Sequence, residues 1–556
     1  MKRFLAVLLS CLLFLGSVYS AENVIKTNKK LPFSKGVNLP GWLEYNRNNT
    51  LLFGKKDFEN IKSLGVEVLR LPVWFEVWNE GAPDYKVSDE CWSYLDDSIS
   101  WCEELGMYII IDFHNDCDGA SKTDPNIEKV LLKVWPQIAN RYKNKGDLVI
   151  YEVMNEPHFK SGNIDADIKK WGTIQGNVLK AIRQIDKKHT VIVGGADWNS
   201  IDSMLKLPEY QDDNLIYNFH DYSPFLFTHQ GAVWTDAKRL TGIPFPYVKE
   251  KMPALPKNPT SSEKWYFQDY PNASSEKTLV APLNKAAEFA NKRNAALMCN
   301  EFGVSMTYAD PQERNNWYRI KNGWMDERNI IRVSWDYNGS FGIFTNSSEA
   351  RFPEDLNKQL IKDMGYKVPA GKSQTWFEAA NKTGNYTIFQ NQLAANLKAQ
   401  CYGSNQKKSI VQFDNETKER SLAFSELEPN GQFTIYFGEV CSFTALKNSG
   451  ARLEFMIKST DKTLSLSVYL LDSEAKTFPW RAATSINSGN LATDGKWHKI
   501  SIPLSSLSDI GGWNSTEGWV NGQGKFDWTL ISSLVFQNGG QASKAGFSIK
   551  DIKIVK

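Results

Sequence analysis

Two kinds of hydrophobic patterning divide the chain. From about residue 30 to 365, short continuous apolar runs alternate with longer stretches in which apolar residues recur at helical spacing. Continuous apolar strands that alternate with helices are typical of a parallel sheet buried on both faces. The runs are Gly36–Leu39, Val68–Leu71, Tyr108–Phe113, Leu148–Met154, Val191–Gly194, Leu215–Phe219, Ala296–Asn300 and Ile331–Trp335.

Eight strand–helix units in this length predict a TIM barrel, with a doubly wound open sheet as the alternative. The segment Phe225–Glu276 is rich in proline and aromatic residues, and we expect it to form a long loop over the barrel mouth. The amphipathic stretches between the strands include Lys55–Ser63, Tyr94–Leu105, Ile127–Tyr142, Lys169–Gln184 and Leu283–Arg293.

Beyond Pro369 the pattern changes to an alternation of apolar and polar residues. Period-two runs broken by Gly, Asn and Asp turns predict an antiparallel β-sandwich. The sequence therefore predicts a leader over 1–20, a barrel domain over 21–370 and a jelly-roll-like sandwich over 385–556. The alternating runs are Phe433–Phe437, Leu453–Ile457, Leu464–Val468 and Lys499–Ile502.

The first 20 residues differ from both domains. A short basic start precedes an apolar run from Phe4 to Leu15, which is typical of a secretory signal peptide cut before Ala21. The run is too short to span a membrane, which takes about 20 apolar residues. A lipoprotein cleavage site at Cys11 is the alternative. We expect a secreted protein that has no membrane attachment once the leader is removed.

The charge balance bears on the kind of partner. Removal of the leader takes away Lys2 and Arg3, so the formal net charge falls from +2 to zero. Proteins that bind nucleic acids usually carry a basic excess, so no nucleic-acid partner is expected. The 19 tryptophans favour a neutral ligand, since indole faces stack on the apolar faces of sugar rings. We expect a monomer with a polysaccharide substrate.

Six cysteines follow the leader, without CxxC spacing or Cys/His clusters, so neither a zinc site nor another metal cofactor is predicted. An exported protein can oxidise its thiols. Cys91–Cys117 and Cys401–Cys441 are the first candidate disulfides, whereas Cys102 and Cys299 are expected to be unpaired core residues.

Polar residues follow most of the predicted barrel strands, at the ends where TIM-barrel active sites are built. A core strand does not need them, and they would converge on one pocket. Hydrolysis of a glycosidic bond needs an acid and a second carboxylate on the other side of the sugar. Glu156 and Glu301 follow strands four and seven, which face each other across a barrel, so they are the candidate pair.

The motifs Asn155-Glu156-Pro157 and Asn300-Glu301-Phe302-Gly303 resemble glycoside hydrolase family 5, the TIM-barrel cellulases and mannanases, over about residues 32–366. The resemblance implies that Glu156 is the acid/base and Glu301 the nucleophile of a retaining mechanism. Residues 217–230 are similar to the endoglucanase branch, apart from Asp221, where relatives often have an aromatic or aliphatic residue. Supporting or substrate-binding roles are implied for Arg70, His114, Asn155, His220, Tyr222 and Trp335.

Charge predicts how these side chains act. Arg70 should hold Glu301 ionised, because a nearby cation favours a carboxylate. Tyr222 can donate a hydrogen bond to Glu301. The pKa of Glu156 should be raised, so that this residue keeps its proton until it is needed. Asn155 can bond the 2-hydroxyl of the sugar, and Trp335 would form the floor of the subsite for the cleaved sugar.

Further tryptophans are candidates for sugar contacts. In the sandwich, which resembles a carbohydrate-binding module over about 390–556, Trp497 is expected in the core. Such modules often bind a structural calcium ion, although no motif here identifies its ligands. The candidates are Trp42, Trp74, Trp78, Trp198 and Trp234 in the barrel, and Trp480, Trp513, Trp519 and Trp528 on a binding face of the sandwich.

These observations together predict a secreted, retaining endo-β-1,4-glucanase that cuts internal bonds of cellulose or mixed-linkage β-glucan. The same residues would serve an endo-β-mannanase or a lichenase, so both are alternatives within the enzyme class. A non-catalytic polysaccharide-binding surface protein is the alternative from another class.

Overall fold

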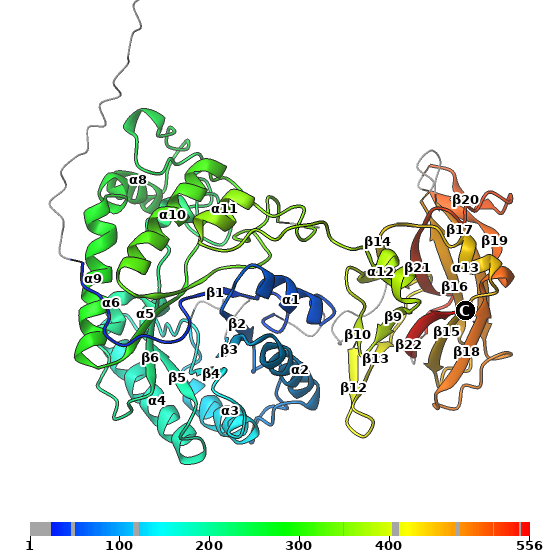
Figure 1. Ribbon diagram of the computed structural model, residues 1–556, viewed down its shortest axis with the longest axis horizontal. Helices are drawn as coiled ribbons and strands as arrows, with labels where there is room; N and C mark the ends of the chain where they lie inside the picture. The colour runs from blue at the N-terminus through cyan, green and yellow to red at the C-terminus, as the bar shows by residue number, and fades with distance from the viewer. Residues whose placement is uncertain are drawn as a thin grey trace, which may run out of the picture.

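The computed structural model describes residues 24–45, 50–114, 122–347, 350–402, 411–473, 479–514, 516–543 and 546–556. The predicted leader, the alternative lipid site at Cys11 and the candidate disulfide partner Cys117 lie outside these residues. Two bodies stand side by side in Figure 1, a barrel ringed by helices and a sandwich of strands.

The first body is a closed barrel of eight parallel strands in sequence order, so the predicted TIM barrel is confirmed and the open sheet is wrong. β8 pairs with β1 and closes the ring, with Ser334 opposite Val37. The strands are β1 (Lys35–Asn38), β2 (Val68–Val73), β3 (Tyr108–Phe113), β4 (Val149–Glu152), β5 (Thr190–Gly194), β6 (Leu215–His220), β7 (Ala296–Glu301) and β8 (Ile331–Ser334).

Helices connect the strands and cover the outside of the barrel (Figure 1). The segment predicted as one long loop, Phe225–Glu276, contains two α-helices and the 3-10 helix η2 (Lys249–Lys251). The longer α-helix has 13 residues and is capped by Thr260 in a reciprocal Thr–Glu capping box. The helices are α1 (Lys55–Ser63), α2 (Asp89–Leu105), α3 (Ile127–Tyr142), α4 (Ile164–Ile185), α5 (Ala196–Asn199), α6 (Ile201–Met204), α7 (Phe225–Thr228), α8 (Ser261–Ala273), α9 (Glu276–Lys292), α10 (Pro311–Glu327) and α11 (Lys358–Asp363). In the part of the chain that is described, no helix combines the length and hydropathy that a membrane crossing requires.

Apolar side chains that point into the barrel fill the half that lies away from the carboxyl ends of the strands. Successive residues of a strand face opposite sides, so every second residue lines the interior. The interior cluster is apolar and buried, and each of its Val, Ile, Met and Phe side chains stabilises the fold by about 1.5–3 kcal/mol. Its members are Phe33, Val68, Ile110, Ile150, Ile192, Ile216, Ala296, Met298, Ile331 and Val333.

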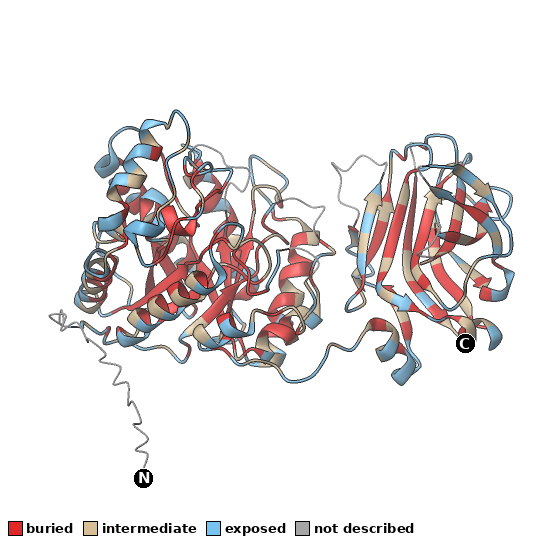
Figure 2. Ribbon diagram, turned by 90° about the horizontal axis from the view of Figure 1, so that it is seen from above, coloured by how far each residue is buried: buried red, intermediate tan, exposed pale blue. Residues whose placement is uncertain are grey.

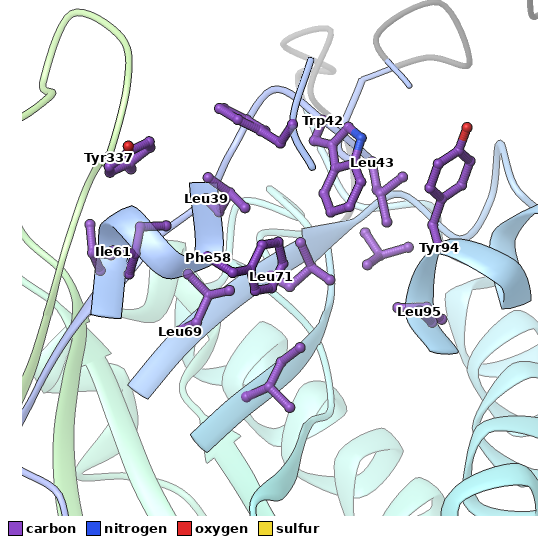
Figure 3. Close-up of a cluster of buried hydrophobic side chains, with 14 of the residues drawn as sticks. Leu39, Trp42, Leu43, Phe58, Ile61, Leu69, Leu71, Tyr94, Leu95 and Tyr337 are labelled. Atoms are coloured by element: carbon purple, nitrogen blue, oxygen red, sulfur yellow. The ribbon is translucent and has the colours of Figure 1, made fainter. Parts of the chain in front are cut away.

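A larger apolar core lies between the strands and the helices. Figure 3 shows its part around β2, where Trp42 lies beside Leu43 and Tyr94. The Trp42 ring stacks on Trp101 with centroids 6.5 Å apart, and its Nε1 donates to the carbonyl of Thr50 at 3.1 Å. Trp42 and Trp78 are both fully buried, so these two candidates for sugar stacking belong to the core.

The second body is the antiparallel sandwich that the period-two pattern predicts. Its two sheets pack face to face, with Phe455 of one against Phe536 of the other at 5.2 Å. A first sheet contains β9 (Tyr386–Gln390), β10 (Gln392–Leu393), β12 (Val411–Asp414), β13 (Glu419–Phe424), β15 (Arg452–Lys458), β18 (His498–Pro503) and β22 (Phe547–Val555). The second contains β11 (Lys398–Tyr402), β14 (Gln432–Cys441), β16 (Ser465–Asp472), β17 (Trp480–Asn487), β19 (Ser508–Asn514), β20 (Gly518–Asn521) and β21 (Ile531–Asn538).

The expected Cys401–Cys441 disulfide is wrong. Cys401 lies opposite Phe433 in the β11–β14 ladder, whereas Cys441 ends β14 beyond a register shift, so the strands hold the two residues far apart. The Cys441 thiol instead contacts the Glu439 carbonyl at 3.9 Å. Cys102 and Cys299 are unpaired and buried, as predicted.

Two sandwich tryptophans exchange their expected places. Trp480 is buried, because it begins β17 at a position that faces the core, so it does not belong to a binding face. Trp497 is half-buried at the surface of the first sheet, where the ammonium groups of Lys458 and Lys550 lie 4.7 and 4.9 Å from its ring. The expectation of a core Trp497 is therefore wrong.

The two bodies contact each other through Arg420 of β13. Its Nη1 lies 2.8 Å from Oδ2 of Asp97 and its Nη2 donates to Oγ of Ser93 at 2.8 Å, both on α2. The guanidinium lies 4.1 Å from the Tyr94 ring centroid, and only 5% of Arg420 is exposed. Asn415 adds a hydrogen bond to Asp89 at the start of α2. Figure 1 shows α2 facing β12 and β13, and Figure 2 shows both bodies from above with their buried strands.

Candidate active site

Polar residues occupy the upper inward-facing positions of the barrel. Two residues beyond the apolar interior layer, the side chains change from hydrophobic to charged or amide groups, because the period of two keeps them on the same face. Arg70 follows Val68 in this way on β2, and Asp112, Glu152, Asn218 and Asn300 follow Ile110, Ile150, Ile216 and Met298 on their strands. A cup of polar side chains therefore lies above the apolar layer of the barrel interior.

Arg70 is the centre of this cup and has no exposed surface. Its guanidinium contacts three carboxylates, with Nε 2.7 Å from Oε2 of Glu152 and Nη1 2.7 Å from Oε1 of Glu301. Nη2 lies 3.0 Å from Oδ2 of Asp112 and donates to Oδ1 of Asn155 at 2.9 Å. The neighbouring carboxylates raise the pKa of Arg70 well above its usual range although burial opposes them, so the residue stays charged.

Glu301 accepts two hydrogen bonds at the end of β7. Besides Arg70, the hydroxyl of Tyr222 donates to its Oε2 at 2.9 Å. Burial raises the pKa of Glu301, and the positive charge of Arg70 works against that shift. The predicted partners of Glu301 therefore both lie in place, and they counteract the cost of burying its negative charge.

Glu156 lies across the pocket from Glu301, in a left-handed backbone conformation with φ of 37°. Such conformations in residues other than glycine are strained and cluster at functional sites. Its Oε1 lies 2.6 Å from Nδ1 of His220. Burial raises the pKa of Glu156 to about 7, which is the direction that an acid catalyst requires.

One oxygen of each carboxylate and a ring nitrogen of His220 all lie within 4.8 Å of one another. Among the described residues these three side chains form the group whose spacing could suit a cation. Within this group, Nδ1 of His220 and Oε1 of Glu156 are in direct hydrogen-bond contact at 2.6 Å.

The remaining predicted residues line the same pocket. His114 contacts Oδ2 of Asp112 through Nδ1 at 2.6 Å, and its Nε2 lies 3.3 Å from Nδ2 of Asn155. Trp335 stacks on the His114 ring with centroids 5.9 Å apart. All eight site residues predicted from the sequence are brought together at the carboxyl ends of the strands.

Sequence reasoning missed the buried acids that support the site. Asp112 and Glu152 both contact Arg70, and Glu44 lies 3.6 Å from Nε2 of His114. Burial raises the pKa of Asp112 to about 7, against the charge of Arg70. A charged residue inside an otherwise apolar run, as in Tyr108–Phe113, was the signal that could have found Asp112.

Asp221, the departure from the family pattern, has a local explanation. Its Oδ2 lies 2.5 Å from Nζ of Lys321 on α10, and both side chains are buried. Its backbone N–H donates to the carbonyl of Glu301 at 3.0 Å. A buried carboxylate is tolerated here because α10 supplies the opposite charge.

Three of the barrel tryptophans considered for sugar stacking are accessible. Trp198 and Trp234 are 44% and 63% exposed, and Trp74 is half-buried. Trp198 stacks on His158, whose Nδ1 donates to the Glu156 carbonyl at 2.6 Å.

Comparison with known sequences agrees with this geometry. Residues 31–341 match the family described as Cellulase (glycosyl hydrolase family 5). The chain belongs to glycosyl hydrolase family 5. Residues 372–556 match Carbohydrate binding domain 30, so the two resemblances predicted from the sequence are confirmed.

Among similar proteins, Endoglucanase 3 of Fibrobacter succinogenes is 30% identical over 348 residues, which cover 59% of this chain and 52% of that protein. The chain thus spans about half the length of that relative. Endoglucanase C of Acetivibrio thermocellus is 29% identical over 323 residues, 55% of this family 5 chain and 91% of the relative. The crystal structure of endoglucanase Cel5A from Thermotoga maritima has 25% identity and a TM-score of 0.48, and it covers 60% of this chain and 96% of its own.

Proposed function

We propose that this chain is a secreted, retaining endo-β-1,4-glucanase whose acid/base is Glu156 and whose nucleophile is Glu301. One observation carries the proposal: an oxygen of each carboxylate lies within 4.8 Å of an oxygen of the other. Retaining glycosidases hold their two carboxyl groups about 5–5.5 Å apart, whereas inverting enzymes leave about 6.5–9.5 Å for a water molecule.

The first displacement forms a bond between Glu301 and the anomeric carbon of the sugar. As the glycosidic C–O bond breaks, the leaving oxygen takes the proton of Glu156, so the aglycone departs as an alcohol. Arg70 and Tyr222, which hydrogen-bond Glu301, orient the attacking oxygen. Positive charge develops on the sugar ring in this step, and the Tyr222 hydroxyl oxygen faces that charge beside the nucleophile.

The second displacement reverses the roles. Glu156, now ionised, removes a proton from water, and the water oxygen attacks the anomeric carbon. The ester bond to Glu301 breaks and the carboxylate returns to Arg70. Two inversions at one carbon leave the product in the β configuration.

The C-terminal domain supports a long polysaccharide as the substrate. On the outer face of its second sheet, Trp513 and Trp519 lie opposite each other across β19 and β20 and are 54% and 46% exposed. The guanidinium of Arg481 lies 5.2 Å from the Trp519 ring and donates to Oε1 of Gln537 at 3.1 Å. Flat aromatic faces beside polar groups suit the two sides of a sugar ring.

The glucan assignment draws on the two relatives described above, both of which carry the name endoglucanase, and secretion draws on the predicted signal peptide. The deciding experiment is proton NMR of fresh products together with reducing-sugar assays on carboxymethylcellulose, lichenan, glucomannan, xylan and laminarin. We expect β-anomers first and the highest rate on a β-1,4-linked glucan. First-formed α-anomers would contradict the retaining mechanism, and a higher rate on mannan would identify a mannanase.

A further inference from the structure

The turn after β5 holds three consecutive residues in the left-handed region. Asp197, Trp198 and Asn199 have φ of 55°, 59° and 53°. Asn and Asp tolerate this region, but a tryptophan there is strained, and such strain persists where surrounding contacts over-determine it. Two contacts of this turn lead to Glu156.

The first contact fixes the turn to the backbone of the acid/base residue. The Trp198 ring stacks on His158 with centroids 3.5 Å apart and planes 13° from parallel. Nδ1 of His158 donates to the carbonyl oxygen of Glu156 at 2.6 Å. The turn is therefore held against the segment that carries Glu156.

The second contact reaches the carboxyl group itself. Asn199 is fully buried, and its Nδ2 lies 3.3 Å from Nε2 of His220. Nδ1 of the same ring lies 2.6 Å from Oε1 of Glu156 and 3.5 Å from Oε2 of Glu301. A neutral imidazole has one N–H donor and one acceptor nitrogen. Because the amide of Asn199 presents a donor, Nε2 accepts and Nδ1 carries the hydrogen.

Gly194 at the end of β5 makes the room for this amide. A Cβ atom at Gly194 would lie 2.4 Å from Oδ1 of Asn199 and 2.3 Å from Oδ1 of Asn218. Both distances are far below contact, so a side chain at this position would displace the amide from the ring of His220. The close approach of the Asn199 amide to β5 therefore depends on the glycine at position 194.

We propose that Asn199 is a positioning residue that fixes His220 as its Nδ1–H tautomer. The imidazole then donates to Oε1 of Glu156 and leaves Oε2 to carry the acid proton toward the leaving group. With the other tautomer, a bare Nδ1 would face Glu156 and compete for that proton. The inference rests on the proposed role of Glu156.

Several ionisable groups surround Glu156 and His220. Burial lowers the pKa of His220 to about 4, which keeps the ring neutral at the pH where Glu156 is protonated. The other ionisable groups that face Glu156 or His220 are Arg70, Asp112, His114, Glu152, His158, Tyr222 and Glu301. None of them contacts Nε2 of His220 among the described hydrogen bonds, so Asn199 alone presents a donor there.

The tautomer can be observed without turnover. The chain has only 6 histidines, so nitrogen-15 labelling of histidine in the full-length protein gives a small set of imidazole signals. Long-range proton–nitrogen correlation at pH 6–8 should identify His220 as the neutral Nδ1–H form. An Nε2–H form or an imidazolium at pH 7 would overturn the inference, whatever the activity of the enzyme.

The variant Asn199→Asp replaces the amide donor with an acceptor of the same shape. A carboxylate beside Nε2 should convert His220 to an imidazolium, and that positive charge should lower the pKa of Glu156. The alkaline limb of the kcat/KM profile is then expected to move down by about 1 pH unit. Asp197→Asn, on the exposed part of the same turn, is the matched control and should leave the profile unchanged. An unmoved limb in folded Asn199→Asp would overturn the inference.

Discussion

Nη1 of Arg70 lies 2.7 Å from Oε1 of Glu301, and the same guanidinium contacts Glu152 and Asp112. One buried cation thus contacts three carboxylates, of which Glu301 is the proposed nucleophile. The site depends on this residue for its stability and for its chemistry, and the two dependences can be separated by experiment.

Arg70→Met should destabilise the protein and abolish its activity. Removing one partner of a buried charge network typically costs about 3–5 kcal/mol, because the other charges are left uncompensated. The free energy of unfolding, measured by denaturant titration, should fall by that amount. Arg332→Met is the control, since Arg332 is also buried but pairs with Asp326 outside the pocket. It should lower stability and leave kcat of the folded enzyme near its original value.

Glu301→Gln should leave a folded protein with almost no activity, because the amide keeps the shape but cannot attack the anomeric carbon. Reducing-sugar release from a soluble β-glucan measures the loss, and circular dichroism checks the fold. Glu67→Gln at the opposite rim of the barrel should remain active. Substantial hydrolysis by folded Glu301→Gln would show that the nucleophile is a different residue.

The acid/base role of Glu156 predicts a distinct chemical rescue. Glu156→Gln should reduce kcat on polysaccharide by about 10²- to 10⁴-fold. In Glu156→Ala, azide can enter the vacated space and attack the glycosyl ester from the β face. An activated aryl glycoside should then yield a β-glycosyl azide, detectable by mass spectrometry and NMR. Release of free sugar without any azide adduct would contradict the assignment.

The pH profile should lose activity as the pH rises through about 7. Burial raises the pKa of Glu156 to about 7, and only the protonated form can donate to the leaving oxygen. Activity that depends on this proton is therefore present below that pKa and lost above it. The kcat/KM profile on a soluble substrate measures the alkaline limb. In Glu156→Ala with an aryl glycoside that needs no acid, this limb should disappear.

The exposed tryptophans of the sandwich should matter for long or insoluble chains only. Trp513→Ala combined with Trp519→Ala removes the aromatic surface of β19 and β20 without touching the barrel. Activity on insoluble cellulose should fall several-fold, since tethering raises the local concentration of substrate, while hydrolysis of short oligosaccharides is unchanged. Trp497→Ala, on the other sheet, is the matched control. Equal losses on both substrates would indicate a structural role.

Arg420 should determine how firmly the sandwich is held to the barrel. Arg420→Met removes the contacts with Asp97 and Ser93, and hydrogen bonds to charged groups contribute about 1.5–3 kcal/mol each. The maximum dimension from small-angle scattering should increase and the melting temperature should fall. Arg452→Met, whose guanidinium bonds Ser501 within the sandwich, should leave the scattering curve unchanged.

The sequence predicted the barrel well because its strands are apolar on both faces, and the observed bounds differ from the predicted ones by only a few residues at either end. The approach of Glu156 and Glu301 to each other could be predicted because strand order decides which residues meet at one end of a barrel. Contacts that depend on the depth of a side chain could not be found. Trp42 and Trp78 read like sugar-stacking residues, yet both fill the core.

The sandwich shows the same limit. The alternation of apolar and polar residues predicted the strands β14, β15, β16 and β18. Which side of the sheet a given residue faces depends on which alternate positions point to the core, and that was less well defined by the sequence for residues at the strand ends. For that reason Trp480 was expected on a binding face and Trp497 in the core, whereas Trp480 is buried and Trp497 lies at the surface. Register also explains the wrong disulfide, because cysteines on neighbouring strands meet only when the ladder places them opposite each other.

Asp221 and Lys321 lie 2.5 Å apart in the interior, one at the end of β6 and the other on α10. Replacing either residue alone leaves the other as an uncompensated buried charge and lowers the stability of the protein. Replacing both with apolar side chains of similar volume leaves the stability nearly unchanged. Descent from an ancestor without the pair would therefore have passed through a less stable protein. Among related proteins, Asp221 and Lys321 should therefore be present together or absent together.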